Sequence, residues 1–160
     1  MRITAVIADD EPLARRRLAS LIADIPWAVQ IGEAHDGADA VEAAERLRPD
    51  VLFLDIQMPA LSGIEVVRRL RRLESPPRVI FTTAHDHYAV AAFELEAVDY
   101  LLKPFGARRF LTALERARDL HVRDTPQRWI ARRRSSGGPS PTPRSIASSR
   151  VKATPSFLCP

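Results

Sequence analysis

Residues 3–12 read Ile-Thr-Ala-Val-Ile-Ala-Asp-Asp-Glu-Pro, and this stretch decides the fold that we expect. Six mostly apolar, strand-forming residues run directly into two carboxylates, and a proline then stands where a helix can begin. An apolar strand followed at once by a helix is the first half of a βα unit. If the unit repeats, the residues that follow each strand gather at one edge of a parallel sheet.

The unit does repeat, because the first 124 residues alternate short apolar runs with stretches of helical period. The expected strands cover Ile3 to Ala8, Ala28 to Glu33, Val51 to Leu54, Arg78 to Thr82 and Val98 to Leu102. Five helices are expected between and after these strands. The first starts near Glu11, the second runs from about Asp36 to Arg48, and the fourth spans about Tyr88 to Leu95. The third turns Ile64, Val67 and Leu70 inward, and the fifth turns Phe110, Leu114 and Ala117 inward.

Five βα units joined by right-handed crossovers predict an α/β fold with helices on both faces of the sheet. We expect a doubly wound five-stranded parallel sheet of the flavodoxin-like kind, in the order 2-1-3-4-5, with five helices. Ligands bind such sheets at the carboxyl ends of the strands, where the strand order reverses between strands one and three. Asp9, Asp10 and Asp55 follow those two strands, so the topology predicts that they share one crevice.

The charge and the composition divide the chain at Asp124. Up to that residue there are 17 Arg and Lys against 20 Asp and Glu, whereas the remaining 36 residues hold seven basic residues and no acidic one. This basic stretch also holds six prolines and seven serines without any hydrophobic period. We therefore expect a domain over 1–124 and a disordered basic tail over 125–160.

No apolar run approaches the roughly 20 residues that a membrane helix needs, so we expect no membrane association. Only six residues separate Arg2 from Asp9, which leaves no room for a secretory signal. Cys159 is the sole cysteine, so no internal disulfide can form. These features together predict a cytoplasmic protein.

Three carboxylates in one crevice repel one another unless a cation offsets their charge. Mg²⁺ prefers oxygen ligands and commonly combines one or two carboxylates with phosphate oxygens, so we expect a Mg²⁺ site at Asp9, Asp10 and Asp55. A carboxylate can also attack phosphorus to form an acyl phosphate. The ammonium of Lys103, the only lysine in the first 124 residues, and the hydroxyl of Thr83 would then stabilise the phosphoryl oxygens.

Four motifs follow the strands: Ile7-Ala8-Asp9-Asp10-Glu11, Phe53-Leu54-Asp55-Ile56-Gln57-Met58-Pro59 with Ser62-Gly63, Thr82-Thr83-Ala84, and Leu102-Lys103-Pro104-Phe105. Together they resemble the receiver domain of bacterial two-component response regulators over about Met1 to Asp124.

The resemblance implies a role for each matching residue. Asp55 would accept a phosphoryl group from the histidine of a sensor histidine kinase, and the backbone carbonyl of Gln57 would join the acidic residues as a metal ligand. Thr83 and Lys103 would bind the phosphoryl group. Tyr100 would act with Thr83 as a switch, moving between outward and inward rotamers when the threonine is drawn toward phosphate. A cis peptide bond before Pro104 is implied as well. Phosphorylation would change the shape of the surface formed by the fourth helix and fifth strand, and this change would favour binding of a partner or formation of a homodimer.

The stretches Phe81 to Phe93 and Val98 to Phe105 are similar, more narrowly, to receivers that carry a LytTR-type DNA-binding domain. The 36 residues after Asp124 are too few for such a domain, so DNA binding is not expected of this chain. A truncated or frame-shifted coding sequence is one hypothesis for this difference.

Two other functions stay open at this point. Seven cations in the tail could bind nucleic acid without sequence preference. An aspartyl-nucleophile phosphatase of the haloacid-dehalogenase type would also use Asp55, but such enzymes usually have a second Asp where this chain has Gln57. We therefore expect a signalling protein rather than an enzyme.

Overall fold

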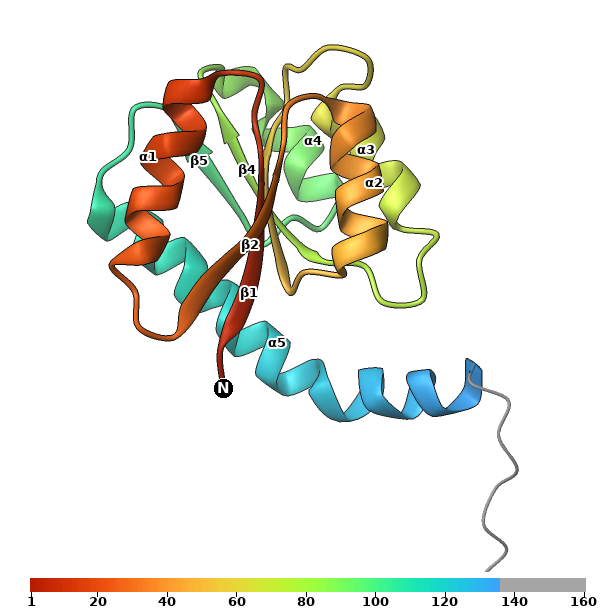
Figure 1. Ribbon diagram of the computed structural model, residues 1–160. Coiled ribbons are helices and arrows are strands. Elements are labelled where there is room, and N and C mark those ends of the chain that lie inside the picture. The colour runs from red at the N-terminus through yellow and green to blue at the C-terminus, as the bar shows by residue number, and fades with distance from the viewer. Residues whose placement is uncertain (136–160) are drawn as a thin grey trace, which may run out of the picture.

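The expected sheet is present in the structure, a computed structural model that describes residues 1–135 of the chain (Figure 1). All five strands are parallel, in the order β2-β1-β3-β4-β5. The strands are β1 (Ile3–Ala8), β2 (Ala28–Ala34), β3 (Val51–Asp55), β4 (Arg78–Thr83) and β5 (Asp99–Leu102). The helices are α1 (Pro12–Ala23), α2 (Gly37–Leu47), α3 (Gly63–Leu70), α4 (Ala89–Glu94), preceded by the 3₁₀ turn η1 (Asp86–Tyr88), and α5 (Ala107–Ser135).

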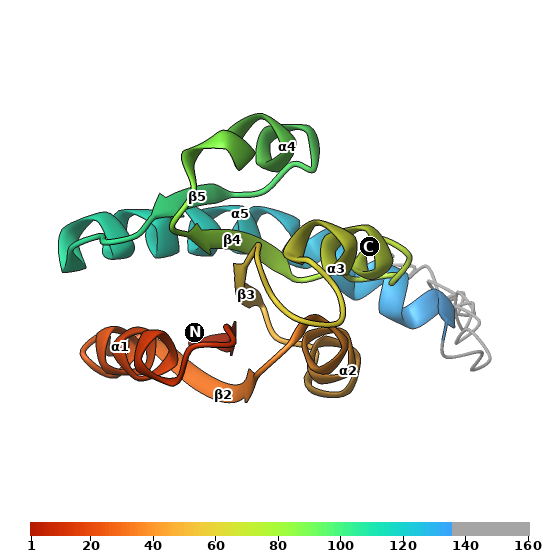
Figure 2. The same cartoon turned by 90° about the horizontal axis from the view of Figure 1, so that it is seen from above.

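Helices cover both faces of the sheet, and each face has its own apolar core. The core beneath α1 and α5 includes Phe53 and Ile80 from the sheet, with Leu18 and Phe110 from the helices. The rings of Phe53 and Phe110 stack with their centroids 5.0 Å apart. The other core lies beneath α2, α3 and α4, and α2 and α3 lie side by side in both views (Figures 1 and 2). Because all of β3 is buried between these layers, its end is held rigidly.

Local signals fix the helix starts next to the carboxyl ends of the strands. Pro12 occupies the first turn of α1, where its missing N–H costs nothing. The side chain of Asp36 caps α2 by accepting a hydrogen bond from the N–H of Asp39 at 2.7 Å. Ser62 and Glu65 form a reciprocal capping box at the start of α3. These caps set the loops that follow β1, β2 and β3.

Two elements differ in detail from the expectation. The fourth helix is shorter than expected, because residues 86–88 form a 3₁₀ turn before the α-helix begins at Ala89. The fifth helix is longer, because α5 continues past Asp124 to Ser135 and runs beyond the edge of the sheet (Figure 1). This continuation includes Pro126, and because a proline has no N–H to donate and crowds the preceding turn of a helix, local sequence preference does not explain the length of the helix. Residues 136–160, most of the expected tail, lie outside the described residues.

Within the described part of the chain, no helix combines the length and the apolar character that a membrane span requires.

Candidate functional site

The first carboxylate of the site follows β1. The N–H of Asp9 donates to the carbonyl of Ala34 at 3.1 Å, which extends the pairing of β1 with β2 by one residue. Its carboxylate is fully buried and accepts a hydrogen bond from the N–H of Glu11 at 2.9 Å. Its carbonyl accepts from Nη1 of Arg15 at 2.7 Å. Asp9 is therefore fixed, whereas Asp10 beside it is exposed.

Asp55 is the last residue of β3 and is 6% exposed. Its Oδ1 accepts a hydrogen bond from the N–H of Gln57 at 3.2 Å. The following loop folds back tightly, and the N–H of Gly63 donates to the carbonyl of Ile56 at 2.7 Å. A Cβ on Gly63 would lie 2.4 Å from the carbonyl oxygen of Asp55, which explains why a glycine starts α3 here. The expected carbonyl role of Gln57 toward a metal remains a prediction.

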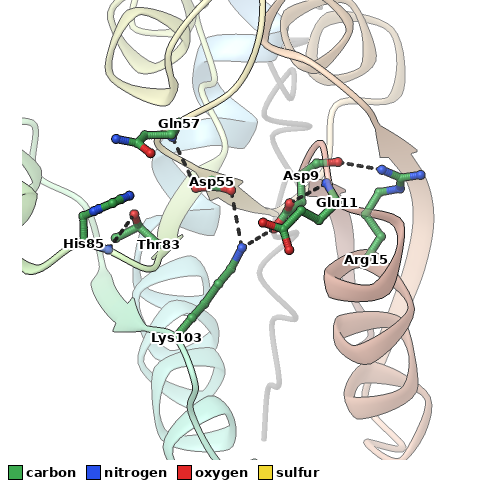
Figure 3. Close-up of polar contacts among 8 residues, drawn as sticks. All are labelled: Asp9, Glu11, Arg15, Asp55, Gln57, Thr83, His85 and Lys103. Carbon is green, nitrogen blue, oxygen red and sulfur yellow. Dashed lines mark hydrogen bonds and ion pairs between the residues drawn. The ribbon is translucent and has the colours of Figure 1, made fainter.

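Lys103 brings a cation between the two buried carboxylates. Its backbone N–H pairs with the carbonyl of Thr83 at 2.7 Å, and the Lys103–Pro104 peptide bond is cis, as expected. The ammonium lies 2.6 Å from Oδ2 of Asp9 and 3.4 Å from Oδ2 of Asp55 (Figure 3). Three strand ends that are far apart in the sequence therefore meet at one ammonium group.

The three predicted metal-ligating acids come together. One carboxylate oxygen from each of Asp9, Asp10 and Asp55 lies within 4.8 Å of the others, and among the described residues this is the group of acidic, His or Cys side chains that could hold a metal ion. All the donors are oxygen atoms and one acid is open to solvent, which fits a hard cation that keeps several water ligands. The set therefore fits Mg²⁺.

Burial raises the pKa of Asp55 to about 6, and the negative charge of Asp9 acts in the same direction. The charge of Lys103 and the N–H of Gln57 act in the opposite direction and reduce this shift. Burial works to lower the pKa of Lys103, but its hydrogen bond to Asp9 and the charges of Asp55 and Asp9 raise it above its usual range. Near neutral pH the site thus holds a basic carboxylate beside a charged ammonium.

The two predicted switch residues are joined through one residue of the loop after β4. Thr83 is fully buried, and its hydroxyl accepts a hydrogen bond from the N–H of His85 at 3.3 Å. The hydroxyl of Tyr100 donates to the carbonyl of His85. Thr83 and Tyr100 therefore hold the two sides of the same peptide segment. The sequence did not predict His85 as this link, because no motif distinguishes a backbone contact.

Sequence reasoning also missed Arg15 and Tyr88. Arg15 lies one turn into α1 and holds the carbonyl of Asp9, with its Nε 3.7 Å from a carboxylate oxygen of Glu33. The hydroxyl of Tyr88 lies 3.2 Å from Nε2 of Gln57, at the mouth of the site. The spacing of Glu11 and Arg15 suggests a pair between these two residues, but Arg15 contacts Asp9 and Glu33 instead, so no sequence signal marked its role. Tyr88 offered none.

The fold and the site define the class of protein. A doubly wound sheet carries an acidic cluster, a lysine and a threonine at its carboxyl edge, and the family profile of the response regulator receiver domain matches residues 5–115. The chain belongs to this family, whose members bind Mg²⁺ at an acidic pocket.

Individual response regulators are similar to this chain in sequence. An uncharacterized response regulatory protein of Vibrio cholerae is 50% identical over 114 residues, which cover 71% of this chain and 44% of that protein. The transcriptional regulatory protein LytR of Staphylococcus aureus is 42% identical over 120 residues, which cover 75% of this chain and 49% of LytR. The chain thus spans about half the length of these relatives.

Among solved structures, the response regulatory domain of mrkE from Klebsiella pneumoniae superposes with a TM-score of 0.71 at 32% identity. The match covers 76% of this chain and 99% of that domain.

Proposed function

We propose that this chain is a phospho-acceptor in a two-component phosphorelay, in which Asp55 takes the phosphoryl group from the histidine of a sensor histidine kinase. The observation that carries the proposal is the position of the Lys103 ammonium, 2.6 Å from Asp9 and 3.4 Å from Asp55. A structural ion pair would need only one of these carboxylates. Two carboxylates and one ammonium at the end of a buried strand suit a group that gains further negative charge.

In the transfer, an oxygen of Asp55 forms a bond to phosphorus while the bond between phosphorus and the histidine nitrogen breaks. The nitrogen keeps the electron pair of that bond. Because burial raises the pKa of Asp55 to about 6, the carboxylate is ionised at neutral pH and is more basic than an exposed one. Asp9, Asp10 and the carbonyl of Gln57 would hold Mg²⁺, which neutralises charge on the phosphoryl oxygens when bound.

The response would travel through Thr83 and Tyr100 to the surface of α4 and β5. Both residues form hydrogen bonds to the backbone of His85. A movement of Thr83 toward the phosphoryl group would therefore shift His85 and change the hydrogen bond that holds the hydroxyl of Tyr100. Val90 and Phe93 on α4 are 70% and 85% exposed, and Leu102 on β5 is 44% exposed. Exposed apolar side chains on these two adjacent elements support a homodimer or a protein partner on this surface. We propose that the chain acts in this way in the cytoplasm and not as an enzyme.

Labelling with radioactive acetyl phosphate and Mg²⁺ tests the acceptor. We expect the unaltered chain to incorporate phosphate and the Asp55→Asn chain to incorporate none, because an amide cannot form the acyl phosphate. Asp36→Asn, which alters an acid at the start of α2, is the matched control and should be labelled normally. Light scattering before and after labelling measures the assembly state. Persistent labelling of Asp55→Asn would disprove the assignment.

A further inference from the structure

Thr82 carries a buried hydroxyl that the functions described above do not use. The residue is fully buried, and among the described residues its Oγ1 is the buried side-chain polar atom that lacks a hydrogen-bond partner. A buried hydroxyl without a partner destabilises the fold, and valine would fill the same volume without that cost. A partner that appears in another state of the protein would explain the hydroxyl.

The register of the sheet places Thr82 next to Asp55. The two residues are direct partners in the pairing of β3 with β4. Phe53 and Ile80, two residues earlier on each strand, both lie in the core beneath α1 and α5. Because side chains alternate along a strand, Asp55 and Thr82 project from that same face, on strands that are about 4.8 Å apart.

Lys103 must cross the end of β4 to reach its partners. Leu101 also belongs to the core beneath α1 and α5, and Lys103 follows it by two residues. Strand β4 lies between β5 and β3, and β1 lies beyond β3. The side chain that begins at the end of β5 and ends at Asp55 and Asp9 (Figure 3) therefore passes over the end of β4, the strand that carries Thr82.

The ammonium of Lys103 needs another acceptor when the site is used. Its shorter hydrogen bond goes to Asp9, one of the acids that would hold a divalent cation. An ammonium has three donors, and a hydroxyl oxygen accepts as well as donates. Once Asp9 serves the cation, the ammonium would keep its contact to Asp55 at 3.4 Å and could donate to a further acceptor, and the buried hydroxyl of Thr82 on the neighbouring strand has no partner.

We propose that Thr82 is a positioning residue, whose hydroxyl accepts a hydrogen bond from the Lys103 ammonium when Asp9 turns to a divalent cation. The hydroxyl then keeps the ammonium beside Asp55 during phosphoryl transfer. This inference rests on the proposed acceptor role of Asp55. The unpaired hydroxyl then destabilises the metal-free protein, and it binds the Lys103 ammonium when the cation is present.

Two substitutions separate the hydroxyl from the shape of the side chain. Thr82→Val keeps the shape and removes the hydroxyl, whereas Thr82→Ser keeps the hydroxyl. With acetyl phosphate and saturating Mg²⁺, we expect Thr82→Val to be labelled about tenfold more slowly, as for one lost hydrogen bond to a charged group. Thr82→Ser should stay within about twofold of the unaltered chain. Without Mg²⁺, Thr82→Val should unfold at a higher urea concentration than the unaltered chain.

Each other outcome overturns the inference. Normal labelling of Thr82→Val would show that the hydroxyl is not used, and equal slowing of both variants would show that only packing matters. A lower urea midpoint for Thr82→Val would show that the hydroxyl already has a partner. Thr112→Val on α5 is the control and should leave the rate unchanged. If the unaltered chain takes no label, the proposed function fails first, which distinguishes that failure from this one.

Discussion

Burial and charge act in opposite directions on the carboxyl group of Asp55. The core beneath it and the neighbouring Asp9 favour the protonated form, whereas Lys103 favours the ionised form. Burial dominates, because the ammonium lies closer to Asp9 than to Asp55. The buried carboxylate that would receive the phosphoryl group is therefore less well compensated by Lys103 than Asp9 is, and this has a measurable consequence for stability.

We expect the metal-free protein to lose stability as the pH rises from about 4 to above 6. The unfolded Asp55 releases its proton near 3.8, and the folded one holds it to about 6. Between these values the folded state binds more protons, so its free energy of unfolding falls with rising pH. Above pH 6 the Asp55→Asn chain should be more stable than the unaltered chain by roughly 1–2 kcal/mol.

Urea unfolding in EDTA at pH 4 and pH 7.5 measures this difference. The two chains should differ less at the lower pH, where Asp55 is largely protonated in the folded state and only partly ionised in the unfolded one. Asp36→Asn is the control for the loss of one acid. An Asp55→Asn chain that is less stable than the unaltered chain at pH 7.5 would show that Lys103, not burial, dominates.

At the level of single residues, the sequence predicted which side chains share the site but not how they contact one another. Asp9, Asp55 and Lys103 each follow an apolar strand, and the carboxyl ends of parallel strands share one edge, so their meeting could be predicted. The closer contact of Lys103 with Asp9 could not be predicted. It depends on the rotamer of a long side chain that crosses β4.

At the level of elements, Asp99 joins the start of β5 to α5. Its carboxylate receives two hydrogen bonds from Arg109, at 2.6 and 2.8 Å, and one from Arg116 at 2.9 Å. The N–H of Tyr100 donates to the same carboxylate at 2.8 Å, so the strand that carries the switch tyrosine is fastened to the last helix. Burial works to raise the pKa of Asp99, but the hydrogen bonds from Arg109 and Tyr100 lower it below its usual value.

We expect Asp99→Asn to lower the free energy of unfolding by roughly 1–2 kcal/mol at pH 7, since both arginines are partly exposed. Because the folded pKa is lowered, this contribution is present above pH 3.8 and is lost as the pH falls through the folded value. Urea unfolding of Asp99→Asn, Arg109→Ala and the double variant measures the coupling of the pair. Arg108→Ala is the control. If the effects of the Asp99 and Arg109 substitutions simply add in the double variant, the ion pair does not contribute to stability.

The expected elements were found where periodicity and caps agreed, and their bounds differed where neither signal was present. The strands and the first three helices follow from apolar runs that alternate with stretches of helical period, and in the structure these helices start beside Pro12, Asp36 and Ser62. The 3₁₀ turn before α4 has no side-chain cap to mark it. The continuation of α5 depends on the preceding helix being held against the sheet, which a local pattern does not contain.

At the scale of the whole molecule, acidic charge is concentrated at one edge of a sheet whose two faces are apolar. The fold gathers Asp9, Asp10 and Asp55 by burying the strands that precede them, so core packing works against charge repulsion at this edge. Lys103 supplies one compensating charge for three carboxylates. A divalent cation would supply the rest, so its binding should stabilise the entire domain rather than the site alone.

We therefore expect Mg²⁺ to raise the thermal midpoint of the chain by several degrees, because a ligand present at 100 times its dissociation constant adds about 2.7 kcal/mol to the free energy of unfolding. Asp10→Ala should remove most of this rise without harming the metal-free fold, since Asp10 is exposed. Asp24→Ala, an exposed acid at the end of α1, should keep it. Calorimetry in MgCl₂ and in NaCl of equal ionic strength separates binding from screening. An equal rise in both salts, or in Asp10→Ala, would mean that the three acids do not form a metal site.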